Sequence, residues 1–165
     1  MIQIHPEARI LIAGQAPGVR VHATGVPFDD PSGDRLRAWM GVSDETFCGK
    51  DVAILPMGFC FPGTGKSGDL PPQPRCAQTW RAQLLYMLSE IRLTLVIGRY
   101  AQDWHLQQKT RTLTETVRNW AAMDPSIVPL PHPSPRNNIW LRKNPWFEEE
   151  LIPTLRERVK SAVAP

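Results

Sequence analysis

The stretch ILIAGQAPG, Ile10–Gly18, decides the fold, because it joins a short apolar run to a loop that proline stiffens and glycine bends. A second stretch of the same kind, IVPL at Ile127–Leu130, leads directly into PHPSPRNN at residues 131–138. Each apolar run predicts a buried strand. Loops that leave the carboxyl ends of parallel strands meet at one crevice in an open α/β sheet, so we expect these two loops to face each other.

Strands and helices alternate along the rest of the chain. Val52–Leu55 and Leu93–Ile97 are the other two predicted strands. The alternation predicts the α/β class, as a three-layer α/β/α sandwich with a central, mostly parallel four-stranded sheet in one domain of residues 1–165. The expected helices cover residues 35–40, 75–90, 113–122 and 145–159, and another begins at residue 99.

Two long loops, residues 14–34 and 57–74, follow predicted strands and therefore belong to the same rim of the sheet. Loops of this length are uncommon in a small domain and are usually functional. In the second of them, Gly63–Ser67 looks like a phosphate-binding P-loop, but the glycine that the pattern requires falls at Cys60, and prolines follow where a helix must begin. We therefore expect no nucleotide hydrolysis at this stretch.

Composition sets further bounds on the function. The chain has 165 residues, a formal net charge of +3 and no apolar run near the ~20 residues of a membrane helix. No signal-peptide core begins the sequence, so we expect a cytoplasmic monomer without membrane contact. The three cysteines are too few and too far apart for a disulfide framework, and we expect buried, reduced thiols.

Four landmarks occur in an order that resembles the uracil-DNA glycosylase superfamily. Gly14–Gly18 looks like its first motif, and Gly25–Phe28 looks like the loop that supplies a base-stacking phenylalanine. Val52–Leu55 takes the place of the base-recognition strand. His132–Pro135 looks like the second motif, which contributes the catalytic histidine and leads into a loop that wedges DNA. The resemblance covers nearly the whole chain and implies base excision from DNA.

The chain is most similar, within that superfamily, to the iron–sulfur glycosylases of thermophiles. Cys60 and Cys76 look like two of their four cluster ligands, but no cysteine precedes Cys48. A cluster with four thiolate ligands cannot be built from this chain. We therefore expect no metal and no cofactor.

The resemblance also implies residue roles. His132 is expected to donate a hydrogen bond to the carbonyl beside the breaking bond, assisted by the amides of residues 58–60, or else to be a structural histidine. Phe28 offers a face for base stacking or packs in the core, and Arg136 fills the space left by the extruded base or contacts a phosphate. The remaining candidates for base binding are Ala16, Gly18, Gly58 and Phe59, and those for DNA binding are Ser134, Asn137 and Lys66.

Several positions depart from the family pattern. Gln15 and Ala16 stand where many members carry a carboxylate or asparagine, and glutamine can hold a water molecule but cannot act as a base. We expect Asp30 to supply the carboxylate beside the sugar, with a turn as the alternative. His22 is expected to bind a phosphate, orient the water or lie on the surface. Gly18 replaces a tyrosine that rejects thymine.

These features predict a monofunctional DNA glycosylase. It would hydrolyse the N-glycosidic bond of uracil or another deaminated base by base flipping and stabilisation of the leaving base anion. Residues 56–59 replace the asparagine that reads uracil, so either backbone amides read the base or the base is not uracil. The alternatives are a non-catalytic module that binds damaged or single-stranded DNA and a hydrolase of free nucleosides.

Overall fold

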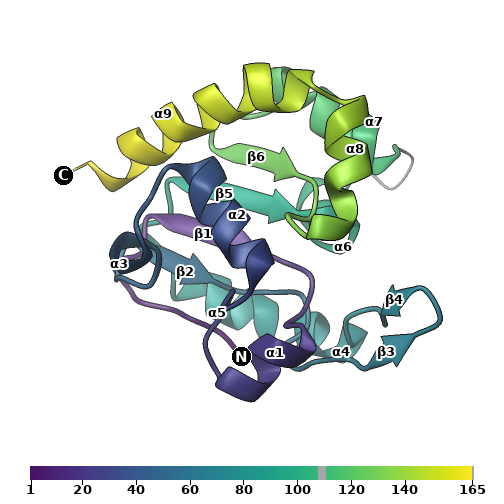
Figure 1. Cartoon of the computed structure of the whole chain (residues 1–165). Helices are drawn as coiled ribbons and strands as arrows, with labels where there is room; N and C mark the ends of the chain where they lie inside the picture. Colours follow the sequence, from purple (N-terminus) through teal and green to yellow (C-terminus); the bar gives the residue numbers. More distant parts are fainter. Residues whose placement is uncertain (108–110, 165) are drawn as a thin grey trace.

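The computed structural model describes residues 1–107 and 111–164, and its centre is a four-stranded sheet of order β2-β1-β5-β6 (Figure 1). All neighbouring strands of this sheet are parallel. The α/β class and the central sheet are confirmed, and the sheet is entirely rather than mostly parallel. The strands are β1 (Ile10–Ala13), β2 (Val52–Ile54), β5 (Leu93–Ile97) and β6 (Ile127–Leu130).

Helices cover both faces of the sheet. Successive strand residues point to opposite faces, and because both sets are apolar, each face must be covered. Ile10 and Ile12 of β1 share one core with α2, α3, α7 and α9. Leu11 and Ala13 face cores formed with residues from the helical segment 74–86 and from α6. The helices are α1 (Val19–Thr24), α2 (Pro31–Met40), α3 (Asp44–Phe47), α4 (Pro74–Cys76), α5 (Ala82–Tyr86), α6 (Gly98–Leu106), α7 (Leu113–Arg118), α8 (Asn138–Lys143) and α9 (Ile152–Val163).

The loop expected over residues 14–34 is wrong in part. It contains α1, and α2 begins at Pro31 rather than at Arg35. The earlier start follows from Asp30, whose side chain accepts a hydrogen bond from the Gly33 N–H at 2.9 Å, and from proline at the first helical position. Gly41 ends α2 in the left-handed conformation, which glycine adopts readily.

The second long loop, residues 57–74, also holds regular structure. β3 (Thr64–Gly65) and β4 (Gly68–Asp69) form an antiparallel hairpin that projects from the body of the molecule (Figure 1). Lys66 and Ser67 form its turn, so the stretch that looks like a P-loop does not open a helix. The prediction that it is no nucleotide site is consistent with this geometry.

Two helical predictions need correction, and α8 is additional to the predicted helices. The helix expected over residues 75–90 ends at Tyr86 and includes a π-helical segment, Ala77–Arg81, in which Trp80 is exposed rather than buried. The last helix is also preceded by a π-helical segment, Phe147–Leu151, and it extends to Val163. Trp140, Trp146 and Phe147 pack edge to face; Phe147 is buried in the core, and the two tryptophans pack against it partly buried.

Candidate active site

The loops that follow β1 and β6 line a single cavity of about 470 Å³. It opens at the carboxyl ends of these strands, where loops of parallel sheets converge. The first loop supplies residues 14–18, and the second supplies His132, Ser134, Arg136 and Asn137. Phe28 and Asp30 from the segment before α2, residues 67–70 of the β3–β4 hairpin and residues 19–21 of α1 also line it.

The Gly14–Gly18 loop is held against the segment that follows β2. The carbonyl oxygens of Gly14 and Gln15 accept hydrogen bonds from the N–H groups of Met57 and Gly58, both at 2.9 Å. These bonds extend the β1–β2 pairing beyond the strands and fix the loop. Within the described residues the side-chain amide of Gln15 makes no hydrogen bond and lines the cavity beside Ala16 and Gly18, so it is free to bind a ligand or water.

Gly58 and Phe59 do not line the cavity. The Gly58 N–H already donates to Gln15, and Phe59 packs against the core that contains Leu11 and Leu55, while its carbonyl accepts from the amino terminus of Met1. The amide of Gly58 is therefore unavailable to assist His132. The part of the prediction that used this amide is not supported by the geometry.

Phe28 lines the cavity with a backbone conformation that is rare for an aromatic residue. Its φ is +57°, in the left-handed region, where a non-glycine residue stores about 1–3 kcal/mol of strain. Arg37 Nη1 donates to the Phe28 carbonyl at 3.4 Å, and the Phe28 ring meets Phe47 edge to face with centroids 5.9 Å apart. Such strain persists only where neighbours enforce it, which marks this residue as a candidate for function.

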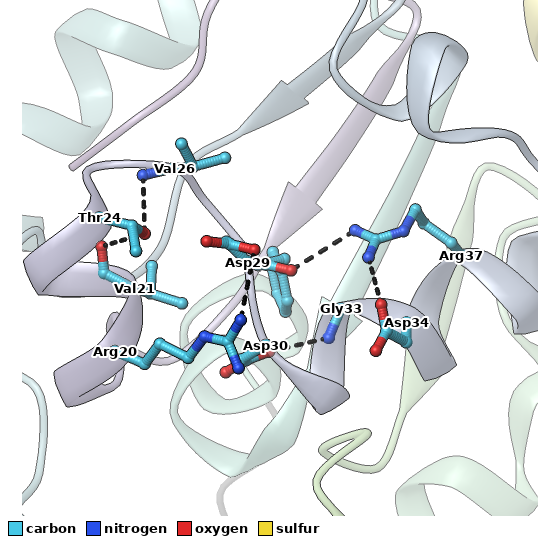
Figure 2. Close-up of polar contacts among 10 residues, drawn as sticks. Arg20, Val21, Thr24, Val26, Asp29, Asp30, Gly33, Asp34 and Arg37 are labelled. Carbon is cyan, nitrogen blue, oxygen red and sulfur yellow. Dashed lines mark hydrogen bonds and ion pairs between the residues drawn. The ribbon is translucent and has the colours of Figure 1, made fainter.

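Asp29 and Asp30 occupy different surroundings, as Figure 2 shows. Asp29 is 43 % exposed and lies 4.0 Å from Arg20. Asp30 lines the cavity and uses Oδ1 to cap α2. One carboxylate oxygen of Asp30 therefore caps a helix where a turn was the alternative, and the side chain borders the cavity.

His132 has a defined hydrogen-bonding state. The backbone N–H of Ser134 donates to His132 Nδ1 at 3.2 Å, so the neutral ring carries its proton on Nε2. Burial lowers the pKa of His132 below its usual value, although the negative charges of Asp30 and Asp69 oppose this shift. Nε2–H makes no hydrogen bond with the described residues, so the histidine keeps a free donor in the cavity wall.

The residues after His132 stabilise the loop that follows β6, and one of them packs over the β3–β4 hairpin. Asn137 Nδ2 donates to the His132 carbonyl at 2.7 Å, and Ser134 Oγ accepts from the Arg136 N–H at 3.2 Å. Arg136 is exposed and packs over the hairpin, since a Cβ on Gly68 would lie 2.6 Å from Arg136 Nη1. The Ser134 hydroxyl proton and the Arg136 guanidinium remain suitable donors to a phosphate.

His22 and Lys66 lie outside the cavity lining. His22 is exposed on α1, and its Nδ1 faces the Phe61 N–H at 3.4 Å. Lys66 is exposed in the hairpin turn.

The cysteines differ from expectation. Cys48 and Cys60 are exposed and Cys76 is partly exposed, so the prediction of buried thiols is wrong, and all three are free. In the portions of the chain that the structure describes, no three His, Cys, Asp or Glu side chains gather as a metal site would require. Cys60 and Cys76 do not suffice for an iron–sulfur cluster.

Sequence reasoning missed a buried arginine that supports the site. Arg81 is 0 % exposed, and its Nη1 donates to the carbonyls of Leu55 and Pro56 at 2.9 and 3.1 Å. Its Nη2 lies 2.7 Å from His105 Nε2, which must accept because a guanidinium only donates. Burial lowers the pKa of Arg81 to about 10, and burial together with the Arg81 charge lowers the pKa of His105 to about 4. The pair fixes the end of β2.

Asp69 and Leu70 were also missed, although both line the cavity. The two-residue turn between Gly65 and Gly68 is a hairpin signal, but the flanking residues lack the alternation that marks a strand. For Arg81 no signal existed, because its partners come from distant segments.

A comparison with protein families agrees with this arrangement. The model of the uracil DNA glycosylase superfamily matches residues 1–156 of the 165. Across residues 1–107 and 111–164, no helix combines the length and apolar character needed to span a bilayer. The chain belongs to the uracil DNA glycosylase superfamily, and this membership implies a DNA glycosylase-type function with DNA as the substrate.

Proposed function

We propose that this protein is a monofunctional DNA glycosylase that hydrolyses the N-glycosidic bond of uracil, or of another deaminated base, in DNA. One observation carries the proposal: His132 and the Gly14–Gly18 loop line the same cavity, together with the strained Phe28. A base extruded from the duplex would enter this cavity and stack on the Phe28 ring. The cavity volume of about 470 Å³ lies in the usual range for small-molecule sites.

Bond cleavage leaves negative charge on the departing base. The Nε2–H of His132 is the donor that would stabilise this charge at the carbonyl next to the breaking bond. Because burial lowers the pKa of His132, the ring is neutral near pH 7 and donates without transferring its proton. The Ser134 N–H fixes the tautomer and the Asn137 amide fixes the loop, so the donor is preorganised.

The sugar gains positive character as the base departs. Asp30 would stabilise that charge through its carboxylate, one oxygen of which caps α2. Water then adds to C1′ and loses a proton, while the bonding electron pair leaves with the base, which is protonated from solvent. Gln15 is suited to hold this water because its side-chain amide makes no hydrogen bond with other described residues.

Two features bear on selectivity and on the reaction's end point. A Cβ added to Gly18 would meet no atom within 4 Å, so this position leaves space where a bulky side chain would reject a methylated base. Selectivity against thymine must therefore come from other groups. No lysine occurs among the described residues that line the cavity, which argues against a Schiff-base lyase step.

DNA would be held by groups around the cavity mouth. The Ser134 hydroxyl and the Arg136 guanidinium would contact phosphates, and the exposed Lys66 would reach the backbone from the hairpin. The alternative role of Arg136 is to fill the space that the extruded base leaves in the stack.

The test is an excision assay on oligonucleotides that carry one uracil, hypoxanthine or xanthine, in single strands and in duplexes. Alkali converts each abasic site to a strand break. Breaks that depend on the altered base support the proposal. A gel shift without breaks would instead indicate a non-catalytic DNA-binding module, and activity on free nucleosides alone would indicate a nucleoside hydrolase.

A further inference from the structure

We propose that Leu70, at the base of the β3–β4 hairpin, is a second wedge that enters the DNA stack beside the cavity during base extrusion. The inference rests on the proposed glycosylase function and adds to it a residue far in sequence from Arg136. It assigns the hairpin a role in opening duplex DNA rather than in cleaving the bond.

The first observation is the position of Leu70. The hairpin projects from the body of the molecule (Figure 1), and Leu70 lines the cavity while 44 % of it remains exposed. A single exposed leucine on a protein surface needs no explanation. An exposed leucine at the mouth of a proposed base-binding cavity is placed where DNA bases would meet it.

The second observation is that Leu70 is fixed. Its backbone N–H donates to the Gly63 carbonyl at 2.8 Å. Its side chain lies over two glycines, since a Cβ on Gly63 would be 3.4 Å from Leu70 Cδ1 and a Cβ on Gly65 would be 3.0 Å from Leu70 Cδ2. Because these two glycines carry no side chains, the Leu70 side chain can pack directly on their backbone. A side chain that is inserted between stacked bases must be held in place in this way.

The third observation is the set of charged residues near Leu70. Lys66 occupies the turn of the hairpin, and the Arg136 guanidinium packs over Gly68. Asp69 lines the cavity next to Leu70, and its charge acts on His132 inside the cavity. The hairpin thus carries an apolar side chain and a lysine and lies against an arginine, a combination that suits duplex DNA, in which phosphates flank stacked bases.

The physical role follows from the cost of opening the stack. Separating a base step costs a few kcal/mol, and apolar side chains inserted between bases offset that cost. A single strand has little stacking to disrupt. Loss of a wedge should therefore affect duplex substrates and spare single-stranded ones.

The experiment compares Leu70→Ala, Leu70→Met and wild type in single-turnover excision. Three substrates are used: a single strand with uracil, a duplex with a uracil–adenine pair, and a duplex with a uracil–guanine mismatch. We expect Leu70→Ala to be about tenfold slower on the uracil–adenine duplex, less impaired on the mismatch and unchanged on the single strand. Leu70→Met, which keeps an apolar side chain of similar size, should retain most activity.

Met87→Ala is the matched control. Met87 is 56 % exposed and lies between α5 and β5, at the amino end of the parallel strands and thus at the edge opposite the cavity. This variant should behave as wild type on all three substrates. Thermal unfolding of each variant confirms that the protein is folded.

A second readout does not require cleavage. In a His132→Ala background, 2-aminopurine placed next to uracil reports unstacking by its fluorescence, and the brightening should shrink when Leu70→Ala is added. Equal loss on single strand and duplex, or no loss on the duplex, would overturn the wedge. Absence of excision by wild type on every substrate would overturn the proposed function instead, and the fluorescence would still test Leu70.

Discussion

A Cβ atom on Gly33 would lie 1.8 Å from the carbonyl oxygen of Phe28. The first turn of α2 therefore packs directly against the backbone of the residue that faces the cavity. The same carbonyl accepts a hydrogen bond from Arg37, and Asp30 caps the helix through the Gly33 N–H (Figure 2). The left-handed conformation of Phe28 is thus enforced by the close packing of Gly33 and by the hydrogen bond from Arg37.

Gly33→Ala should disrupt this arrangement. The added methyl group cannot fit, so Phe28 must move, and we expect unfolding to become easier by about 2 kcal/mol or more, with loss of excision. Urea denaturation and the oligonucleotide assay measure the two effects. Gly18→Ala is the control, because its Cβ meets no atom within 4 Å, and it should keep wild-type stability. A Gly33→Ala protein with full stability and activity would show that the Phe28 conformation is not required.

Asp30→Asn separates the two roles of Asp30. Asparagine caps helices as well as aspartate does, so the unfolding temperature should stay near that of wild type. The negative charge beside the sugar is lost, and we expect excision to fall about 10²-fold. Single-turnover rates and thermal unfolding are measured together. Full activity in a stable variant would remove Asp30 from the chemistry.

The pH dependence of excision follows from His132. Burial lowers its pKa below the usual value near 6.5, so the neutral donor persists as pH falls from about 8 to about 6.5 and is lost only at lower pH. The rate should be level over that range and decline below it. In Asp30→Asn the decline should move to still lower pH, because the Asp30 charge raises the pKa. A rate that halves at or above pH 6.5 contradicts the assignment.

The buried pair Arg81 and His105 predicts how stability changes with pH. His105 has a pKa of about 4 in the folded state and about 6.5 when unfolded, so the unfolded chain binds more protons between these values. Stability should therefore fall as pH drops from 6.5 to 4, by about 3 kcal/mol in total from this group. His105→Gln keeps an acceptor for Arg81 but does not titrate. Denaturation of both proteins across this range should show a smaller slope for the variant, and identical slopes would contradict the prediction.

Much of the fold could be predicted from short apolar runs. The four strands of the central sheet were found because short runs of four or five mostly apolar residues near glycine or proline are typical of buried strands. The start of α2 was missed because Asp30 and Pro31 were assigned to the loop over residues 14–34, although the same pair signals a capped helix. The β3–β4 hairpin was missed because its strands have two residues each and no alternation.

The candidate site could be predicted in part, because the strands that were found determine where the loops between them converge. His132, Gln15, Phe28 and Asp30 follow strands or precede a helix, and topology alone brings such segments together. The amide of Gly58 could not be placed, because its partner, the Gln15 carbonyl, is set by a pairing that continues past the strand ends. Arg81 looked like a surface residue of a helix, and only the packed structure shows its two carbonyl partners.

The most direct test of the account is single-turnover excision of uracil from DNA by His132→Ala. With the donor removed, we expect the rate to fall about 10²-fold or more while the affinity for DNA stays near that of wild type. His5→Ala, which replaces a histidine remote from the cavity, should excise normally. A His132→Ala protein that excises uracil as fast as wild type would contradict the claim that this histidine stabilises the leaving base.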